Sequence, residues 1–346
     1  MWRKNWFKFI IGIIIILLLA GSIFGWHYYK IIFYPISKTD SPTSIYIPTG
    51  SEFDDVVKIL WEDEIIIDTN TFIWLARKKN YPTLVKPGHY LIHPGMSNNI
   101  FINMLRAGKQ TPVNVIFNTL YFKEEFASVI SKQIEADSTS ILELLNDAKY
   151  LKQYDTDPEN VFCLLIPNTY EFYWNSSATQ FMERMFRENN KFWNEKRKKN
   201  STEINLSVQQ VTTLASIVEL ESSKNEEKPI IAGVYINRIK KGMLLQADPT
   251  LKFAKGDFSI KRLLKKDKEI DSPYNTYKYA GLPPGPICLP SVTSIDAVLN
   301  YEDHNYLFFC ADAENPGYHV FTKSYNQHLQ NAKRYQRFLN REKIYR

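Results

Sequence analysis

The chain has 346 residues, of which 44% are hydrophobic and 14% aromatic, and its formal net charge is +6. This much apolar material is enough for packed cores and excludes an intrinsically disordered chain. The mild positive charge forms no basic stripe interleaved with aromatic residues, which argues against a nucleic-acid-binding protein. The three cysteines, Cys163, Cys288 and Cys310, are too far apart for a zinc knuckle and too few for a disulfide-rich scaffold. We expect them to be buried as small hydrophobic residues.

The amino terminus carries the pattern of a membrane anchor. Residues 9–29 hold no formally charged side chain and are rich in Ile and Leu, which matches the ~20 residues that a helix needs to cross a bilayer. Tryptophan and tyrosine flank the run, and basic residues precede it. The positive-inside rule then places residues 1–8 in the cytoplasm and the body of the chain outside it.

A cleaved signal peptide is the alternative to this anchor, with small residues at 20–22 as its cleavage site. The apolar character continues past these positions to residue 29. We therefore predict an uncleaved transmembrane helix over 9–29.

A linker over 30–44 leads to a small module that we place at 45–112. The pattern predicts a strand, two helices, a strand and a further helix. The expected positions are a strand at 45–47, helices at 52–62 and 70–79 with Ser51 capping the first, a strand at 90–92, and a helix from the Ser97 cap to residue 105. Taken alone, this order indicates only a small α/β domain.

The remaining region, 113–346, is predicted to mix helices and strands. Its first part shows a strand at 113–117, helices at 123–133, 139–145 and 177–189, and an apolar run over 163–173 that Pro167-Asn168-Thr169 interrupts. Residues 195–205 lack apolar periodicity apart from Ile204. We interpret them as a solvated hinge.

The last part of the chain begins with a helix from Pro229 to Lys241 that ends at Gly242. Asp248 is then placed to cap a helix whose first residue is Pro249. Further on, we expect proline-stiffened loops around 272–287, a strand pair at 306–310 and 319–321, and a closing helix from the Ser324 cap to about residue 339.

The central helix of this region is predicted over 207–223. Ser207 and Gln210 have the spacing of a capping box, so a helix should start there. Four apolar residues then recur at helical spacing and should face a core: Val211, Leu214, Ala215 and Val218.

Two glutamates near the end of this helix point in nearly opposite directions. Glu219 shares its face with small side chains, which leaves room for a ligand. Glu221 faces apolar neighbours instead, and burial without a nearby cation would raise its pKa towards the range of a general acid. The plainer interpretation is that both are solvated residues of a helix, because glutamate is a good helix former.

Several motifs in the carboxy-terminal part occur together and in a definite order. They are Leu214-Ala215-Ser216-Ile217-Val218-Glu219, Val234-Tyr235-Ile236-Asn237-Arg238, Leu245-Gln246-Ala247-Asp248-Pro249-Thr250, Tyr274-Asn275-Thr276-Tyr277, Gly281-Leu282-Pro283-Pro284-Gly285-Pro286-Ile287, and residues 308–312. In this order they resemble the endolytic murein transglycosylase family (MltG, YceG-like). The resemblance is specific from 214 to 339 and weaker over the module and the anchor. One departure is Asn168, where the family usually has an acidic residue.

The resemblance implies an α+β protein in three parts: a single N-terminal transmembrane helix, a small LysM-like α/β module at 45–112, and a mixed α+β catalytic region at 113–346. It also implies that Glu219 is the catalytic acid and base. The substrate would be the glycan strand of peptidoglycan, cut internally between N-acetylmuramic acid and N-acetylglucosamine to leave 1,6-anhydro ends. Such an enzyme needs no metal or cofactor, because the sugar's own C6 hydroxyl is the nucleophile.

Seven further side chains are candidate substrate contacts beside Glu219. They are Gln246, Asp248, Thr250, Asn275, Thr276, Tyr277 and Glu221. For Gln246, Asn275 and Thr276, a structural role as loop clamps explains the residue type equally well.

Two other functions remain open at this point. A non-catalytic scaffold would hold peptidoglycan without cutting it, and a glycoside hydrolase would need a second carboxylate, for which Glu221 or Asp248 is available. In each case the expected partners are glycan strands, the membrane, and peptidoglycan synthases or division proteins, with no nucleic acid. The expected location is the inner (plasma) membrane, with the catalytic region periplasmic or otherwise extracytoplasmic.

Overall fold

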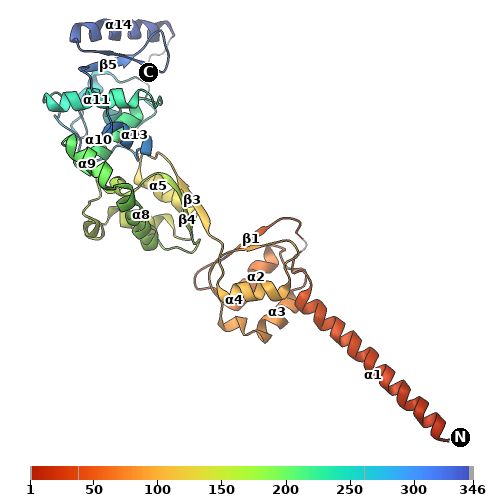
Figure 1. The fold of residues 1–346 in the computed structure, drawn as a ribbon. Helices are drawn as coiled ribbons and strands as arrows, with labels where there is room; N and C mark the ends of the chain where they lie inside the picture. The colour runs from red at the N-terminus through yellow and green to blue at the C-terminus, as the bar shows by residue number, and fades with distance from the viewer. Residues whose placement is uncertain (1, 38, 261, 343–346) are drawn as a thin grey trace. The chain divides into compact units, whose positions relative to one another are not determined.

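The computed structural model describes residues 2–37, 39–260 and 262–342. The chain divides into two compact units. Unit 1 comprises Met1–Asn114, Gln133–Glu135 and Glu171–Ser176, and unit 2 comprises Val115–Lys132, Ala136–Tyr170 and Ser177–Arg346. Among the described residues, helices alternate with short strands that form three two-stranded sheets, so the predicted mixture of helix and strand is confirmed (Figure 1).

Unit 1 begins with one long helix, α1 (Trp2–Phe33). Within Trp6–Phe33, the most apolar window of the helix has a mean hydropathy of 2.6, and no part of this window is buried. Among the described residues this is the one helix with the length and composition to cross a membrane. At its end, the side-chain amide of Asn98 donates to the backbone oxygen of Ile31 at 3.2 Å.

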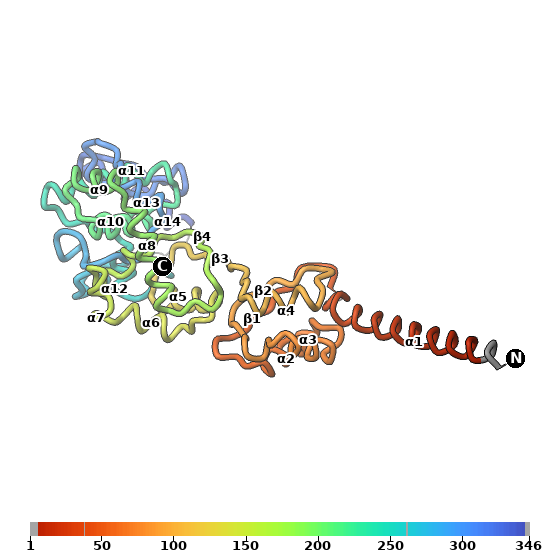
Figure 2. Tube along the Cα trace, turned by 60° about the horizontal axis from the view of Figure 1, so that its bottom comes forward, coloured from red at the N-terminus to blue at the C-terminus, as the bar shows by residue number. Residues whose placement is uncertain are grey.

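The module that follows has the predicted order of elements (Figure 2). These are β1 (Thr43–Ile47), α2 (Phe53–Glu62), α3 (Thr69–Lys78), the 3₁₀ turn η1 (Tyr81–Thr83), β2 (Gly88–Ile92) and α4 (Asn98–Ala107). The two strands are antiparallel, with Ile45 opposite Tyr90, and both side chains are buried. Ser97 caps α4 as predicted. The predicted Ser51 cap of α2 is wrong, because Glu52 and Asp55 form a capping box one residue later.

The elements that follow the module are one strand pair, whose ends belong to unit 1, and short helices of unit 2. In order, the elements are β3 (Val113–Phe117), α5 (Lys123–Ser131), α6 (Ser138–Asn146), α7 (Ala148–Leu151), the turns η2 (Lys152–Tyr154) and η3 (Val161–Leu164), β4 (Asn168–Phe172) and α8 (Ala178–Phe192). β3 pairs with β4. The predicted interruption at Pro167-Asn168-Thr169 is therefore the start of a strand. Asn168 lies at that start, and its side-chain oxygen accepts from the backbone N–H of Thr169 at 2.8 Å.

The predicted hinge at 195–205 is wrong, because most of it forms helix α9 (Glu195–Glu203). Asn194 caps the helix by accepting from the backbone N–H of Arg197. Arg197 then donates twice to the carboxylate of Asp296, at 2.9 and 3.0 Å, and its guanidinium lies over the ring of Phe192 at 4.0 Å. The helix is thus held by a cap and an ion pair. Apolar periodicity cannot reveal either contact.

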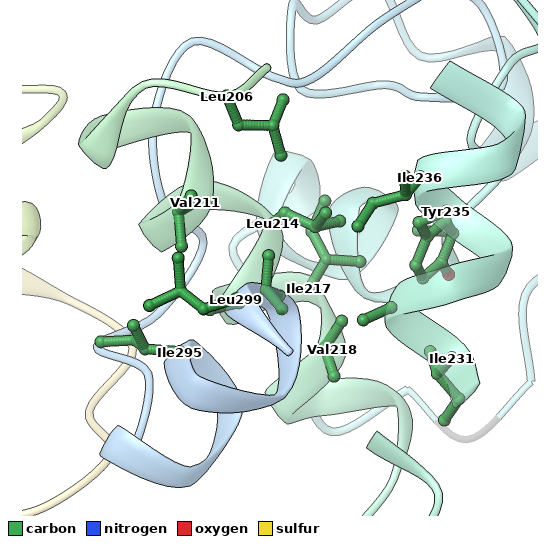
Figure 3. Packing of buried hydrophobic residues seen from close by; sticks show 14 of the residues in the cluster. Leu206, Val211, Leu214, Ile217, Val218, Ile231, Tyr235, Ile236, Ile295 and Leu299 are labelled. Atoms are coloured by element: carbon green, nitrogen blue, oxygen red, sulfur yellow. The ribbon is translucent and has the colours of Figure 1, made fainter. Parts of the chain in front are cut away.

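The core of unit 2 lies where three helices meet: α10 (Val208–Glu221), α11 (Lys228–Lys240) and α13 (Val292–Leu299). Figure 3 shows Leu214, Ile217 and Val218 of α10 packed among side chains of α11 and α13. Ser207 and Gln210 form the predicted capping box. The predicted apolar stripe is buried, but so is every other residue from 211 to 218, so α10 is enclosed on all sides at its centre.

Five elements complete the described part of unit 2. They are α12 (Asp248–Lys255), the turn η4 (Lys265–Glu269), the antiparallel pair β5 (Phe308–Ala311) and β6 (His319–Thr322), and α14 (Tyr325–Arg341). The strand pair and the closing helix confirm the prediction, but Ser324, at the cap position of α14, makes no side-chain capping hydrogen bond. Gly242 follows α11 with a φ of +64°, as expected of a glycine that ends a helix. Cys163 and Cys288 are buried as expected, whereas Cys310 is only partly buried.

We expect the Arg197–Asp296 pair to stabilise the fold measurably. An Arg197→Met variant of the full chain should lose about 1 kcal/mol of unfolding free energy in urea. It removes the two hydrogen bonds to Asp296, a third to the backbone oxygen of Phe192, and the cation–π contact of a partly exposed pair. Lys198→Met removes the same charge from an exposed neighbour and should change stability by less than about 0.5 kcal/mol. Equal losses in the two variants would contradict a specific role for this pair.

Candidate functional site

Glu219, in the last turn of α10, lies at the centre of the site because two other helices supply donors to its carboxylate. From the start of α13, the hydroxyls of Ser291 and Ser294 both donate to Oε2, the first at 2.5 Å. From α11, the ammonium of Lys228 donates to the same oxygen at 3.2 Å. The lysine side chain is 5% exposed, so this is a buried ion pair.

The amino-terminal end of α13 is directed at this carboxylate. Ser291 caps the helix by accepting from the backbone N–H of Ser294, and its own backbone N–H donates to Oε2 of Glu219 at 3.3 Å. The free N–H groups and the dipole at a helix start both favour a negative charge. Oε2 of Glu219 therefore lies in a strongly positive environment.

The second carboxylate oxygen, Oε1, is held much more weakly. Among the described residues, its one hydrogen bond comes from the hydroxyl of Thr119 at 3.3 Å. The Glu219 side chain keeps 15% of its surface exposed. One oxygen thus fixes the carboxylate in place, while the other remains able to exchange a proton.

These contacts set the charge of Glu219. Burial by itself raises the pKa of this carboxyl, but the hydroxyls of Ser291 and Ser294 and the charge of Lys228 outweigh burial and hold the pKa below its usual value. In the protein without substrate, Glu219 is therefore an ionised carboxylate at neutral pH.

The neighbours of Glu219 differ from those that helical spacing predicted. Among the described residues, the small side chains of its own helix face make no hydrogen bond to the carboxylate. Ser216, for example, is buried, donates to the backbone oxygen of Thr213 and accepts from the N–H of Ile287. The actual partners, which sequence reasoning missed, are Thr119, Lys228, Ser291 and Ser294. Ser291 follows Pro290, and Ser294 comes three residues later. This spacing is a helix-start signal that could have located both serines.

Glu221 lies in a second cluster, on the side of α10 that faces α11 and α12. The hydroxyl of Tyr235 donates to it at 2.6 Å. Burial raises the pKa of Glu221 to about 7, and the nearby carboxylate of Asp248 adds to the rise, while Lys252 and Arg238 oppose it. The predicted rise in pKa is thus confirmed in direction, although the cluster contains cations that the sequence did not indicate.

Asp248 is not the helix cap that the sequence predicted. Ala247 occupies the cap position of α12, and no side chain caps the helix there. Asp248 is instead the first helical residue, exposed, and accepts from the hydroxyl of Tyr277 at 2.5 Å. That contact brings two of the predicted substrate residues together.

Three other predicted substrate residues are buried and bonded within the chain. Thr250 and Thr276 share a hydrogen bond at 2.9 Å, and the hydroxyl of Thr276 accepts from the backbone N–H of Ala247. The amide of Asn275 donates to the backbone oxygens of Lys268 and Ile270. These contacts favour the loop-clamp role for Thr250, Asn275 and Thr276.

Gln246 differs from these three because its side chain is exposed. Its backbone has a φ of +52°, in the left-handed region that non-glycine residues rarely adopt. Its backbone N–H donates to the oxygen of Thr276 at 3.0 Å, so the clamp maintains this conformation. Strained backbone of this kind is concentrated at functional positions.

Within the described residues no group of three or more His, Cys, Asp or Glu side chains could hold a metal ion.

Comparisons with known proteins agree with the resemblance that the motifs indicated. A model of the YceG-like family matches residues 45–334. The chain is 30% identical over 328 residues to an endolytic murein transglycosylase of Bacillus subtilis, with 89% of each protein covered. It is 28% identical to an endolytic murein transglycosylase of Streptococcus pneumoniae, over 88% of this chain and 61% of that protein. A crystal structure of a YceG-like protein from Listeria monocytogenes superposes with a TM-score of 0.56 at 29% identity, covering 84% of this chain and 99% of that one.

The raised pKa of Glu221 predicts a specific dependence of stability on pH. Between the usual carboxyl pKa of 4.5 and the folded value of about 7, the folded chain keeps a proton that the unfolded chain has released. Stability should therefore fall as the pH rises through this window. In Glu221→Gln the amide cannot ionise, so the stability of this variant relative to the wild type should rise by about 2 kcal/mol between pH 5 and pH 8.

Urea unfolding of the full chain at pH 5, 6 and 8 measures this difference. Glu183→Gln, at an exposed position of α8, is the matched control and should follow the wild type at every pH. The explanation is wrong if Glu221→Gln shows the same pH dependence as the wild type.

Proposed function

The chain belongs to the YceG-like family, and on this premise we propose that it is a membrane-anchored endolytic lytic transglycosylase of peptidoglycan. The endolytic murein transglycosylases to which it is similar support this reaction. The observation that carries the proposal is the carboxylate of Glu219. It is fixed through Oε2, only weakly bonded at Oε1, and partly open to solvent.

In the first step, protonated Glu219 acts as general acid. Its proton passes to the oxygen that joins N-acetylmuramic acid to N-acetylglucosamine, and the bond from the anomeric carbon to that oxygen breaks. N-acetylglucosamine leaves with a free hydroxyl. The carboxylate that remains is stabilised by Lys228 and by the hydroxyls of Ser291 and Ser294, which therefore favour the charge that develops during the step.

In the second step, the same residue acts as general base. The C6 hydroxyl of N-acetylmuramic acid gives its proton to Glu219 and bonds to the anomeric carbon, which closes the 1,6-anhydro ring. The proton lost in the first step is regained in the second, and no water is consumed. One carboxylate is therefore sufficient, whereas glycoside hydrolases normally use two.

The acid step requires Glu219 to be protonated, although its pKa is lowered in the free protein. A glycan strand that covers the exposed side of Glu219 removes water from the carboxylate, and loss of solvation raises a carboxyl pKa. Activity should consequently be greatest at mildly acidic pH.

The exposed and partly exposed residues in and beside α12 are the proposed substrate contacts. Gln246 and Tyr277 offer polar groups that can orient the sugar or stabilise positive charge near the anomeric carbon, and Asp248 holds Tyr277. Glu221 lies behind this surface, where the buried hydroxyl of Tyr235 donates to it. Thr250, Asn275 and Thr276 maintain the loop from within.

The anchor and the module complete the proposal. Helix α1 crosses the cell membrane with residues 1–8 in the cytoplasm, so that the catalytic region lies outside it. The module at 45–112 is LysM-like and contacts glycan strands. Held beside newly made peptidoglycan, the enzyme limits the length of nascent strands in the company of synthases or division proteins.

We expect Glu219→Gln to abolish cleavage. The full wild-type chain, incubated with purified peptidoglycan, should release fragments with 1,6-anhydromuramyl ends, as measured by mass spectrometry. Glu219→Gln should lower the rate at least about 10²- to 10⁴-fold, because the amide cannot donate or accept the proton. Glu226→Gln, at an exposed position in the loop before α11, is the control and should retain the wild-type rate.

The products distinguish the other functions. Fragments with reducing ends would indicate a hydrolase with Glu221 or Asp248 as second carboxylate. If the folded wild-type chain binds peptidoglycan without cleaving it, the protein is a scaffold and the proposal is wrong.

Lys228 should control the pH range of the reaction. In Lys228→Gln the ammonium no longer stabilises the carboxylate, so the pKa of Glu219 should rise. The alkaline limb of the pH–activity profile should then move to higher pH, because Glu219 keeps its catalytic proton longer. Lys224→Gln removes a nearby lysine that lies over the ring of Tyr318, and should leave the profile in place. An unshifted profile in Lys228→Gln would contradict the proposed role of the ammonium.

A further inference from the structure

A group of five partly exposed aromatic rings lies in unit 2, and we call it the aromatic platform. Its members are Tyr121, Phe122, Phe253, Phe258 and Tyr274. The ring centroids of Tyr121 and Phe258 lie 4.4 Å apart, and those of Phe253 and Tyr274 lie 4.6 Å apart. Phe122 stacks on Phe253 at 6.2 Å. Rings that remain partly exposed in such a group offer a continuous apolar surface to a ligand.

The platform borders a pocket of about 210 Å³. Four rings of the platform line the pocket, together with Pro158, Pro286 and the charged side chains of Lys123, Glu124 and Glu159. A mostly apolar pocket with a few polar groups at its rim is the usual form of a small-ligand site.

The pocket adjoins the proposed catalytic carboxylate. Thr119 donates to Glu219, and Tyr121 follows only two residues later, at most ~7 Å further along the backbone. On the other side, Pro286 leads to Ser291, which also donates to Glu219. The two segments are joined directly, because the N–H of Leu289 donates to the oxygen of Leu120 at 2.8 Å. The segments that line the pocket are thus the ones that bring Thr119 and Ser291 to Glu219.

A sugar ring of the substrate has the chemistry to fit this pocket. A pyranose presents a face of C–H groups that aromatic rings can cover, while its hydroxyl and acetamido groups lie around the edge. Lys123, Glu124 and Glu159 can bond such edge groups.

The stem peptides of peptidoglycan are a poorer match, because they carry carboxylates. Glu124 and Glu159 are exposed carboxylates at the pocket rim, and the ammonium of Lys123 already donates to Asn146 and to the backbone oxygen of Pro158. Like charges would therefore oppose an acidic peptide.

We propose that the aromatic platform is a glycan subsite, which binds an N-acetylhexosamine ring of the strand next to the bond that Glu219 cuts. This inference rests on the proposed function for the identity of the sugar. The platform then has a positioning role, because it holds the strand in register with Oε1 of Glu219.

Binding of a sugar probe to the full chain in detergent tests the subsite. The probe is the β-1,4-linked tetramer of N-acetylglucosamine, titrated calorimetrically into the Glu219→Gln chain. Adding Phe253→Leu or Tyr274→Leu should weaken binding about tenfold, because each removes a stacking ring and keeps an apolar side chain. Tyr274→Phe, which retains the ring, should restore the affinity.

Tyr301→Leu is the matched control, since this ring is also partly buried against the same core but lies outside the platform. It should leave the affinity unchanged, and thermal unfolding checks that every variant is folded. Equal affinity in the Tyr301→Leu and platform variants would overturn the subsite. So would binding of free stem peptide that competes with the sugar.

The two proposals can fail separately. Binding is measured on a chain that cannot cleave, so it does not depend on the reaction. A wild-type chain that leaves peptidoglycan intact would contradict the transglycosylase proposal, whereas the subsite depends on the sugar affinity and its loss in the platform variants.

Discussion

One charged and largely buried carboxylate constrains how the helices of unit 2 pack around the site. A carboxylate that leaves water without a partner costs several kcal/mol, so Glu219 can be ionised here only because Lys228 and the start of α13 surround it. Each partner comes from a different helix, and small shifts of α11 or α13 would remove it. The packed core between α10, α11 and α13 therefore does more than stabilise the fold, since it also fixes the charge of the site.

The two glutamates of α10 are driven to opposite protonation states by their surroundings. Glu219 is held ionised by hydroxyls and an ammonium, whereas Glu221 keeps its proton to about pH 7 through burial and the nearby Asp248. Environments that separate the pKa values of neighbouring carboxyls are typical of catalytic sites. Arg238, beside Glu221, donates to the backbone oxygens of Leu244 and Leu245 and so braces the loop before α12. Next to it, Asp248 holds Tyr277, and the Thr250–Thr276 clamp supports Gln246 in its left-handed conformation. Both clusters thus fix parts of the surface that we assign to the substrate.

Local signals in the sequence predicted the helices better than they predicted the site. The capping box at Ser207 and the glycine after α11 act within one turn, so the sequence reveals both. The partners of Glu219 act over long range, because Ser291 lies 72 residues away and Thr119 lies 100 residues away. Helix α9 was missed for the same reason, since its ion pair joins residues 99 apart. For Asp248 the local signal was misleading. Its sequence context fits a helix cap, but its carboxylate accepts a hydrogen bond from the hydroxyl of Tyr277 instead.

The proline-rich loop at 281–287 explains how these distant segments meet. A side chain at Gly285 would lie 2.3 Å from the backbone oxygen of Glu159, so only glycine permits this close approach. The approach brings Pro286 to the pocket wall, and the N–H of Ile287 then donates to Ser216 of α10. Four residues later the chain reaches Ser291 and the carboxylate of Glu219. A loop stiffened by proline thus fixes both the pocket wall and the start of α13. The position of the proposed sugar ring and the charge of the proposed catalytic residue therefore depend on the same backbone segment.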